Sequence, residues 1–203
     1  RDLQMILWVA KAAGFGNDWD ALARRGLATP FEVRQIKRNE ALLRLVRARL
    51  HLVSNRREDR LVFDLQTAVA NSFGFHDAAT PDGPPAARRV PAIRASEALM
   101  RRYYWAAKAV TQLSQILLLN MEEMLYPSDA ELRPVNPDFN DKAGLLNMAS
   151  DDLYQRNPHA ILQTFLLLQT TPGLQGLSSR TLRALYNARG LMDGKFRSDP
   201  VNH

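Results

Sequence analysis

The stretch "NRREDRLVFDLQ", residues 55–66, places five charged side chains directly before an apolar helical pattern. Glu58 and Asp59 suit a helix N-terminus, where the positive end of the helix dipole favours carboxylates. Arg56 and Arg57 are disfavoured there, so they need an acidic partner or a bound anion. The residues therefore leave two interpretations open: contact with a phosphate or an acidic surface, or an internal ion-pair network.

A second mixture of basic and aromatic residues occurs in "MRRYYWAAK". Such a mixture can stack bases and hold phosphates. Helical spacing favours a simpler division, in which Tyr103 packs inward while Arg101, Arg102 and Lys108 stay in solvent. Arg101 and Tyr104 are then the better candidates for ligand contact.

The dipeptide His76-Asp77 raises the question of a metal-dependent phosphohydrolase, since such enzymes use His and Asp ligands on packed helices. Here the dipeptide lies beside a loop rich in Pro and Gly, and metal sites need convergent ligands. The remaining histidines are scattered along the chain, at His51, His159 and His203. We expect no metal site in this chain. The chain also lacks G-x-S-x-G, P-loop and dinucleotide-binding signatures, so it shows no complete active site.

Composition narrows the class of protein further. The 203 residues carry a net charge of +6 and no cysteine. A disulfide framework is therefore excluded, and a reducing, cytoplasmic compartment is the default expectation. The charge favours anionic partners such as a nucleotide, but it is modest for a nucleic-acid binder. Charges or amides interrupt the apolar runs well before the roughly 20 residues that a membrane span needs. Because the chain opens on Arg1 inside an apolar segment, we interpret it as a piece of a longer protein.

Helical periodicity punctuated by glycine and proline predicts a mainly all-α fold. We expect a multi-helix bundle with long amphipathic helices and at most a small β-hairpin near residues 138–148. Thr29 is the expected N-cap of the helix that begins at Pro30, and Asn55, Glu58 or Asp59 marks the start of the next. We expect a surface loop over residues 74–94. The predicted domains are a helical bundle over residues 1–126 and, packed on the same unit, a hairpin or loop plus helices over residues 127–203.

Five blocks of the sequence, taken in order, resemble one family. They are "RDLQMILWVAK", "RARLHLVSNRREDRLVFDLQ", "MRRYYWAAKAV", "DLYQRNPHAILQTFLLL" and "LRALYNARGLMDGKFRSDP". The chain is similar to the bacterial bifunctional uridylyltransferase/uridylyl-removing enzymes that modify the PII nitrogen-signalling protein. The resemblance covers residues 1–200 and corresponds to the helical segment between the nucleotidyltransferase core and the HD hydrolase domain.

The resemblance implies a division of labour in the whole enzyme. An upstream core uses Mg²⁺ to transfer UMP from UTP to a tyrosine of PII, a downstream HD domain removes it, and C-terminal domains sense glutamine. The Mg²⁺ is bound mainly outside this segment, which is expected to be inactive alone and to help position the nucleotide. Asp2 is a candidate late carboxylate of the transferase site. The resemblance implies that the cleft facing the transferase core, around triphosphate or ribose, is lined by Arg56, Arg57, Glu58, Asp59 and Arg60. Together with the contact candidates Arg101 and Tyr104, these are the predicted nucleotide-binding residues.

Two other functions remain open. A basic helical nucleic-acid binder is one, although the modest charge makes nucleic acid an unlikely partner. A purely structural docking domain without nucleotide contact is the other. The kinetics of arginine variants in the full-length protein would separate the second from the positioning role.

Overall fold

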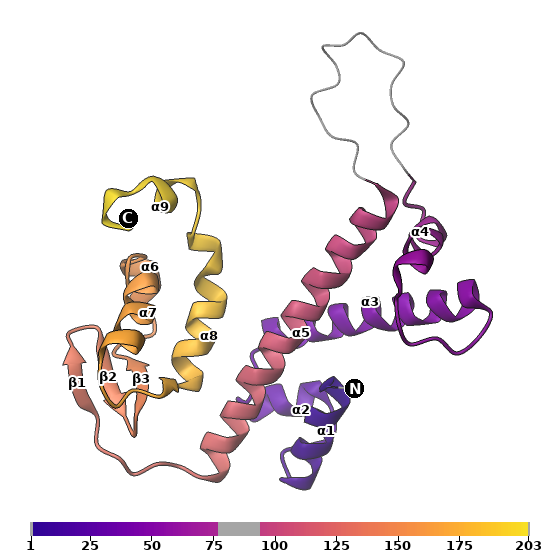
Figure 1. The fold of residues 1–203 in the computed structure, drawn as a ribbon. Coiled ribbons are helices and arrows are strands. Elements are labelled where there is room, and N and C mark those ends of the chain that lie inside the picture. Colours follow the sequence, from indigo (N-terminus) through magenta and orange to yellow (C-terminus); the bar gives the residue numbers. More distant parts are fainter. Residues whose placement is uncertain (1, 77–93, 203) are drawn as a thin grey trace. The chain divides into compact units, whose positions relative to one another are not determined.

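The computed structural model of the chain describes residues 2–76 and 94–202, and of residue 2 only the backbone (Figure 1). The chain divides into two compact units. The first holds residues 1–8 and 16–113, and the second holds residues 9–15 and 114–203. The predicted domain boundary near residue 126 stays a prediction. In the part of the chain that is described, no helix combines the length and the apolarity needed to cross a membrane.

The chain is mainly helical, as predicted. The helices of the first half are α1 (Asp2–Ala12), α2 (Trp19–Arg24), α3 (Pro30–Ser54), α4 (Phe63–Ser72) and α5 (Ala95–Leu125). The later elements are β1 (Arg133–Asn136), β2 (Phe139–Lys142), β3 (Leu145–Met148), α6 (Leu153–Arg156), α7 (Ala160–Thr170), β4 (Gly176–Leu177), α8 (Ser179–Ala188) and α9 (Gly194–Ser198). Short 3₁₀ turns cover residues 189–191 and 200–202.

The start of α3 follows directly from its sequence. Thr29 is the N-cap, as predicted, and its hydroxyl accepts a hydrogen bond from the Glu32 N–H at 3.1 Å. The Glu32 carboxylate accepts the Thr29 N–H at 2.7 Å, which completes a capping box. Pro30 occupies the first helical position, where no N–H is needed. The capping box and Pro30 together define where this 25-residue helix begins.

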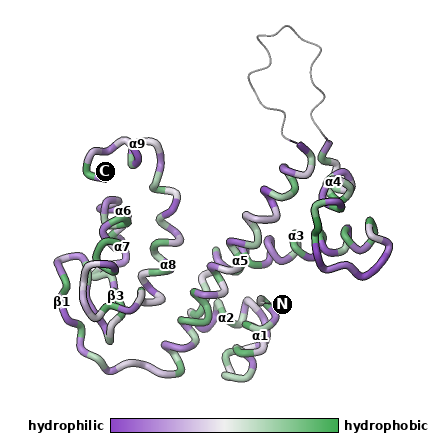
Figure 2. Tube along the Cα trace, viewed as in Figure 1, coloured by the Kyte–Doolittle hydropathy of each residue, from purple (hydrophilic) through white to green (hydrophobic). Residues whose placement is uncertain are grey.

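The start predicted for the next helix was wrong. Residues 56–62 are not helical, and α4 begins only at Phe63, behind an N-cap Val62 that makes no side-chain cap. Asn55 instead ends α3 in the left-handed conformation, with φ of 51°. Asparagine suits this position as well as an N-cap, so the local signal was ambiguous. Figure 2 shows that the connection is strongly hydrophilic where it leaves α3 and becomes hydrophobic just before α4.

One core of the first unit lies where α3, α4 and the start of α5 pack together. Its buried residues are Val46, Leu50, Val69, Ala70, Ala95 and Leu99. Val46 and Leu50 on α3, and Ala95 and Leu99 on α5, are each four residues apart, and this spacing places each pair on one helical face. Leu61, just before α4, also packs against this core, so its apolar character serves packing although it is outside the helix.

The second unit contains a sheet that is larger than predicted. We expected at most one small hairpin, whereas the sheet has four strands in the order β1-β2-β3-β4. β1, β2 and β3 are antiparallel neighbours, and β4 pairs in parallel with β3. Ala143 and Gly144 have positive φ in the turn between β2 and β3, as the tight turns of hairpins require. β1 and β4 escaped prediction because strands of four and two residues give little periodicity.

The two faces of this sheet differ. Phe139, Leu146 and Met148 point into a core with α6, α7 and α8. That core also holds Tyr154, whose hydroxyl lies 2.9 Å from that of Thr164, and burial raises the pKa of Tyr154 to about 12. The alternate residues of β2 and β3 point to the opposite face, since side chains alternate along a strand.

Candidate functional site

The charged connection between α3 and α4, residues 55–62, is tied to the last turns of α3. Asp59 accepts hydrogen bonds from Nε and Nη2 of Arg47 at 2.7 and 3.2 Å. Nε2 of His51, one turn further along α3, lies 3.4 Å from the same carboxylate. Arg47 first and His51 second hold the pKa of Asp59 below its ordinary value. Asp59 thus anchors the connection to α3 and does not cap α4.

Glu58 organises the connection internally. Its carboxylate accepts the backbone N–H of Arg60 at 3.0 Å and Nη2 of Arg56 at 2.8 Å. These contacts, with the Arg60 N–H first, lower the pKa of Glu58. Both carboxylates are therefore ionised at neutral pH and already engaged by donors of the chain itself.

The arginines outnumber these carboxylates. Within the described residues, Arg57 and Arg60 are exposed and their guanidinium groups have no side-chain partner. Arg56 and Arg47 are exposed as well, although each is paired. The connection and the adjoining turns of α3 thus carry four exposed arginines and two carboxylates, and only two of these arginines are paired. Such a surplus of planar donors suits phosphate or carboxylate groups on a ligand.

Sequence reasoning missed Arg47 and His51 as members of this cluster. They lie four residues apart on α3, which places them on one helical face. That spacing was the available signal, but only the fold brings Asp59 back against them, across 12 and 8 residues of sequence.

The other predicted contact residues lie on α5. Tyr103 packs against the core of the first unit, as predicted, while Tyr104 is exposed and its ring meets that of Tyr103 edge-on at 5.8 Å. Arg101 is exposed. Among the described residues, no hydrogen bond or ion pair joins Arg101 or Tyr104 to the connection at residues 55–62, so the structure does not unite them into one cluster. The side chain of Asp2 lies outside the described part.

Within residues 2–76 and 94–202, no group of three or more His, Asp or Glu side chains is placed to hold a metal ion. His76 is exposed at the end of the first described range, and Asp77 lies outside it.

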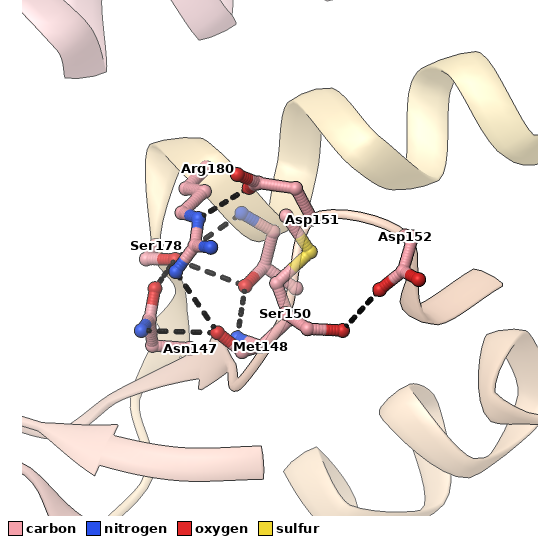
Figure 3. A network of polar contacts seen from close by, with 8 residues as sticks. Asn147, Met148, Ser150, Asp151, Asp152, Ser178 and Arg180 are labelled. Carbon is pink, nitrogen blue, oxygen red and sulfur yellow. Dashed lines mark hydrogen bonds and ion pairs between the residues drawn. The ribbon is translucent and has the colours of Figure 1, made fainter. Parts of the chain in front are cut away.

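A second polar network surrounds the start of α8 in the second unit (Figure 3). The Ser178 hydroxyl donates to Oδ1 of Asn147 at 2.9 Å, and Thr181 Oγ1 accepts the Met148 N–H at 3.0 Å. Arg180 donates to Asp151 at 2.7 Å and to the Met148 carbonyl at 3.2 Å. This network joins β3 to α8. Ser178, Thr181 and Met148 are buried in it, whereas Arg180 and Asp151 are exposed.

Comparison with known proteins identifies the family. A family model described as GlnD PII-uridylyltransferase matches residues 1–118, more than half of the chain. The chain belongs to the PII-uridylyltransferase family. A second model of the same family, the uridylyltransferase GlnD third domain, matches residues 139–203. The resemblance stated from the sequence is thereby confirmed.

Over the aligned residues, curated relatives in this family are more than half identical to the chain. The bifunctional uridylyltransferase/uridylyl-removing enzyme of Cupriavidus metallidurans is 57% identical over 203 residues, and that of Cupriavidus pinatubonensis is 56% identical. The enzyme of the same name from Burkholderia thailandensis is 53% identical over 204 residues. The chain is fully covered in each case, but it spans only 22% of the relatives' length. No solved structure matches it.

Proposed function

We propose that this chain is an accessory helical segment of a bifunctional uridylyltransferase/uridylyl-removing enzyme. Its role is to help position UTP, and with it the PII substrate, for transfer of UMP to a PII tyrosine. The chemistry belongs to the rest of the polypeptide, and the cytoplasm of a bacterium is its place of action. The observation that carries the proposal is the match of the entire chain to about a fifth of enzymes that bear this name.

The arginine surplus at residues 55–62 supports the positioning role. UTP carries a triphosphate, and positioning a triphosphate requires fixed cations that leave the reacting phosphorus accessible. Glu58 and Asp59 bind Arg56 and Arg47 and so hold the connection in shape, while Arg57 and Arg60 project without side-chain partners. The carboxylates order the loop, and the free guanidinium groups meet the phosphates. Arg101 and Tyr104 remain candidates for a separate contact with the nucleotide.

Magnesium belongs, by the resemblance, to the transferase core. The described residues offer no cluster of ligands that fits it. In this proposal, the residues of the chain act on the nucleotide by binding and orientation. The carboxylates that hold Mg²⁺ lie mainly elsewhere in the enzyme, and Asp2 is the one candidate from this chain.

The test uses the full-length enzyme with Arg57→Ala, Arg60→Ala and the double substitution. We expect each single change to raise the KM for UTP about tenfold, the size expected when a charge-assisted contact is lost. Melting temperature should not change, because neither guanidinium has a partner within the described fold. Arg38→Ala is the matched control, since Arg38 is an exposed arginine on α3 outside the cluster.

Two results would count against the proposal. Unchanged UTP kinetics in the double variant would favour a purely structural docking segment. UMP transfer to PII by the 203-residue chain alone would show that it is no accessory segment.

A further inference from the structure

Helix α7 of the second unit carries apolar side chains on both of its faces. Ala160 and Ile161 on its inner face are buried in the core with the sheet. Leu162, Phe165 and Leu166 follow one another at positions i, i+3 and i+4, so they lie side by side on the opposite face. These three side chains are 40%, 48% and 58% exposed. A stripe of large apolar side chains therefore faces away from the core.

The composition of α7 differs from that of an ordinary surface helix. Its 11 residues, "AILQTFLLLQT", include no charged side chain. A helix at the surface normally places charged residues opposite its core-facing stripe, and a helix that is apolar all round is normally buried. The neighbouring α8 follows the normal pattern, because Arg180 and Asn187 are the residues exposed on it. The contrast within one unit indicates that the outer face of α7 is covered in the whole enzyme.

The C-terminal turn of the chain lies near this helix but does not cover the stripe. Oδ1 of Asn202 is 2.8 Å from Nδ1 of His159, the residue just before α7, so this turn is already attached at the start of the helix. Val201 in the same turn is itself 74% exposed. The cover must therefore come from outside the residues that the structure describes.

The length of the whole enzyme provides a source for the cover. The chain spans only 22% of the relatives' length, so most of such an enzyme lies outside residues 1–203. Domains of one polypeptide bury roughly 600–1,500 Å² against one another. Apolar faces with few charges are typical of permanent contacts, whereas transient contacts are more polar. A face without any charge suits permanent packing within one polypeptide.

The size of the face argues against a separate molecule as the cover. With 11 residues, α7 is about 16 Å long and about 10 Å wide, so half of its surface is about 250 Å². A stable interface between separate proteins buries about 800 Å² on each partner. Two parts of one chain need less area, because the covalent link gives them an effective concentration in the millimolar range. A face of this size is therefore sufficient within one chain and too small for a dimer.

We propose that the outer face of α7 is the contact surface for another part of the same polypeptide, outside residues 1–203. That part presents an apolar, uncharged surface to Leu162, Phe165 and Leu166, because a charge buried against these side chains would lack a partner. The inference rests on the proposed function only in taking the chain to be a segment of a longer enzyme. It does not involve the arginines at residues 55–62.

The test measures thiol labelling in the full-length enzyme. The chain contains no cysteine, so Leu166→Cys and Phe165→Cys each place one new thiol on the face. Asn187→Cys is the matched control, since Asn187 is exposed on α8. Maleimide labelling of each new thiol is followed by mass spectrometry of the peptide that contains it, in the native enzyme and in urea. The native rate is then divided by the rate of the same variant in urea.

We expect this ratio to be at least about tenfold lower for Leu166→Cys and Phe165→Cys than for the control, because a covered thiol reacts only after local opening. The protection should not change on dilution, since a contact within one chain does not depend on protein concentration. Labelling as fast as in the control would show an open face and overturn the inference. Protection that is lost on dilution would assign the face to a second copy and would overturn it too.

The labelling result and the UTP kinetics can fail independently. Fast labelling together with a raised KM for UTP in Arg57→Ala and Arg60→Ala would refute the contact surface and leave the positioning role. Slow labelling with unchanged UTP kinetics would do the reverse. UMP transfer at the wild-type rate by the cysteine variants shows that they are folded.

Discussion

Two polar networks of this molecule differ in their exposure to solvent. The connection at residues 55–62 sets Glu58 and Asp59 among arginines that are exposed to solvent. The network at the start of α8 centres on Thr181 and Ser178, which are buried, and on the backbone of Met148. Exposed ion pairs contribute little to stability, whereas a buried group left without a partner is costly. The first network can therefore bind a ligand at little cost in stability, whereas the second stabilises the fold.

The largest expected effect comes from breaking the buried network. Thr181 is fully buried, and its hydroxyl accepts the Met148 N–H. Thr181→Val keeps the shape of the side chain and leaves that N–H unsatisfied, so we expect a loss of about 2 kcal/mol in the free energy of unfolding. Urea denaturation of the chain measures it. Thr170→Val, at an exposed hydroxyl on α7, should cost less than about 0.5 kcal/mol.

An intermediate effect is expected where the buried network meets α5. The Glu123 carboxylate accepts two hydrogen bonds from Ser179. In Glu123→Gln the side chain keeps one oxygen that can accept a hydrogen bond, but its amide NH₂ then faces a donor group of Ser179. The free energy of unfolding should therefore fall by about 1 kcal/mol. Glu122→Gln makes the same change of charge on the neighbouring residue, which has no such contacts, and should be nearly neutral. Equal effects in the two variants would mean that the charge, and not the contact, matters.

The sequence predicted local features well and distant contacts poorly. The Thr29 cap and Pro30 start of α3 were predictable because all their partners lie within three residues. Asn55 was misassigned because asparagine suits both ends of a helix. The contacts of Asp59 with Arg47 and His51 hold the following residues against α3 outside any helix, so Asn55 ends α3. The pairing of β4 with β3 was out of reach, since two residues at Gly176–Leu177 carry no periodic signal.

The same reason applies to the candidate sites. The arginines at residues 56–60 were visible as a charge cluster, but which of them remain unpaired depends on contacts with α3. The network at the start of α8 had no signal in the sequence either. Its Ser178–Asn147 and Thr181–Met148 hydrogen bonds join residues that are 31 and 33 positions apart. Sequence patterns find groups that act within one element, and the fold decides which groups meet across elements.

The smallest effect on stability is expected from the exposed network. Asp59→Asn removes the ion pair with Arg47 and leaves the side-chain shape intact. The pKa of Asp59 lies below its ordinary value in the fold, so its contribution is present above the unfolded-state pKa and is lost as pH falls through the folded-state pKa. The melting temperatures of the wild-type chain and Asp59→Asn should differ slightly at neutral pH and converge in acid. High salt should also narrow the difference, because it screens exposed charges. If Asp59→Asn destabilised the chain as much as Thr181→Val, the main role of the charged connection would be to stabilise the fold. That result would contradict the proposal that its arginines bind a ligand.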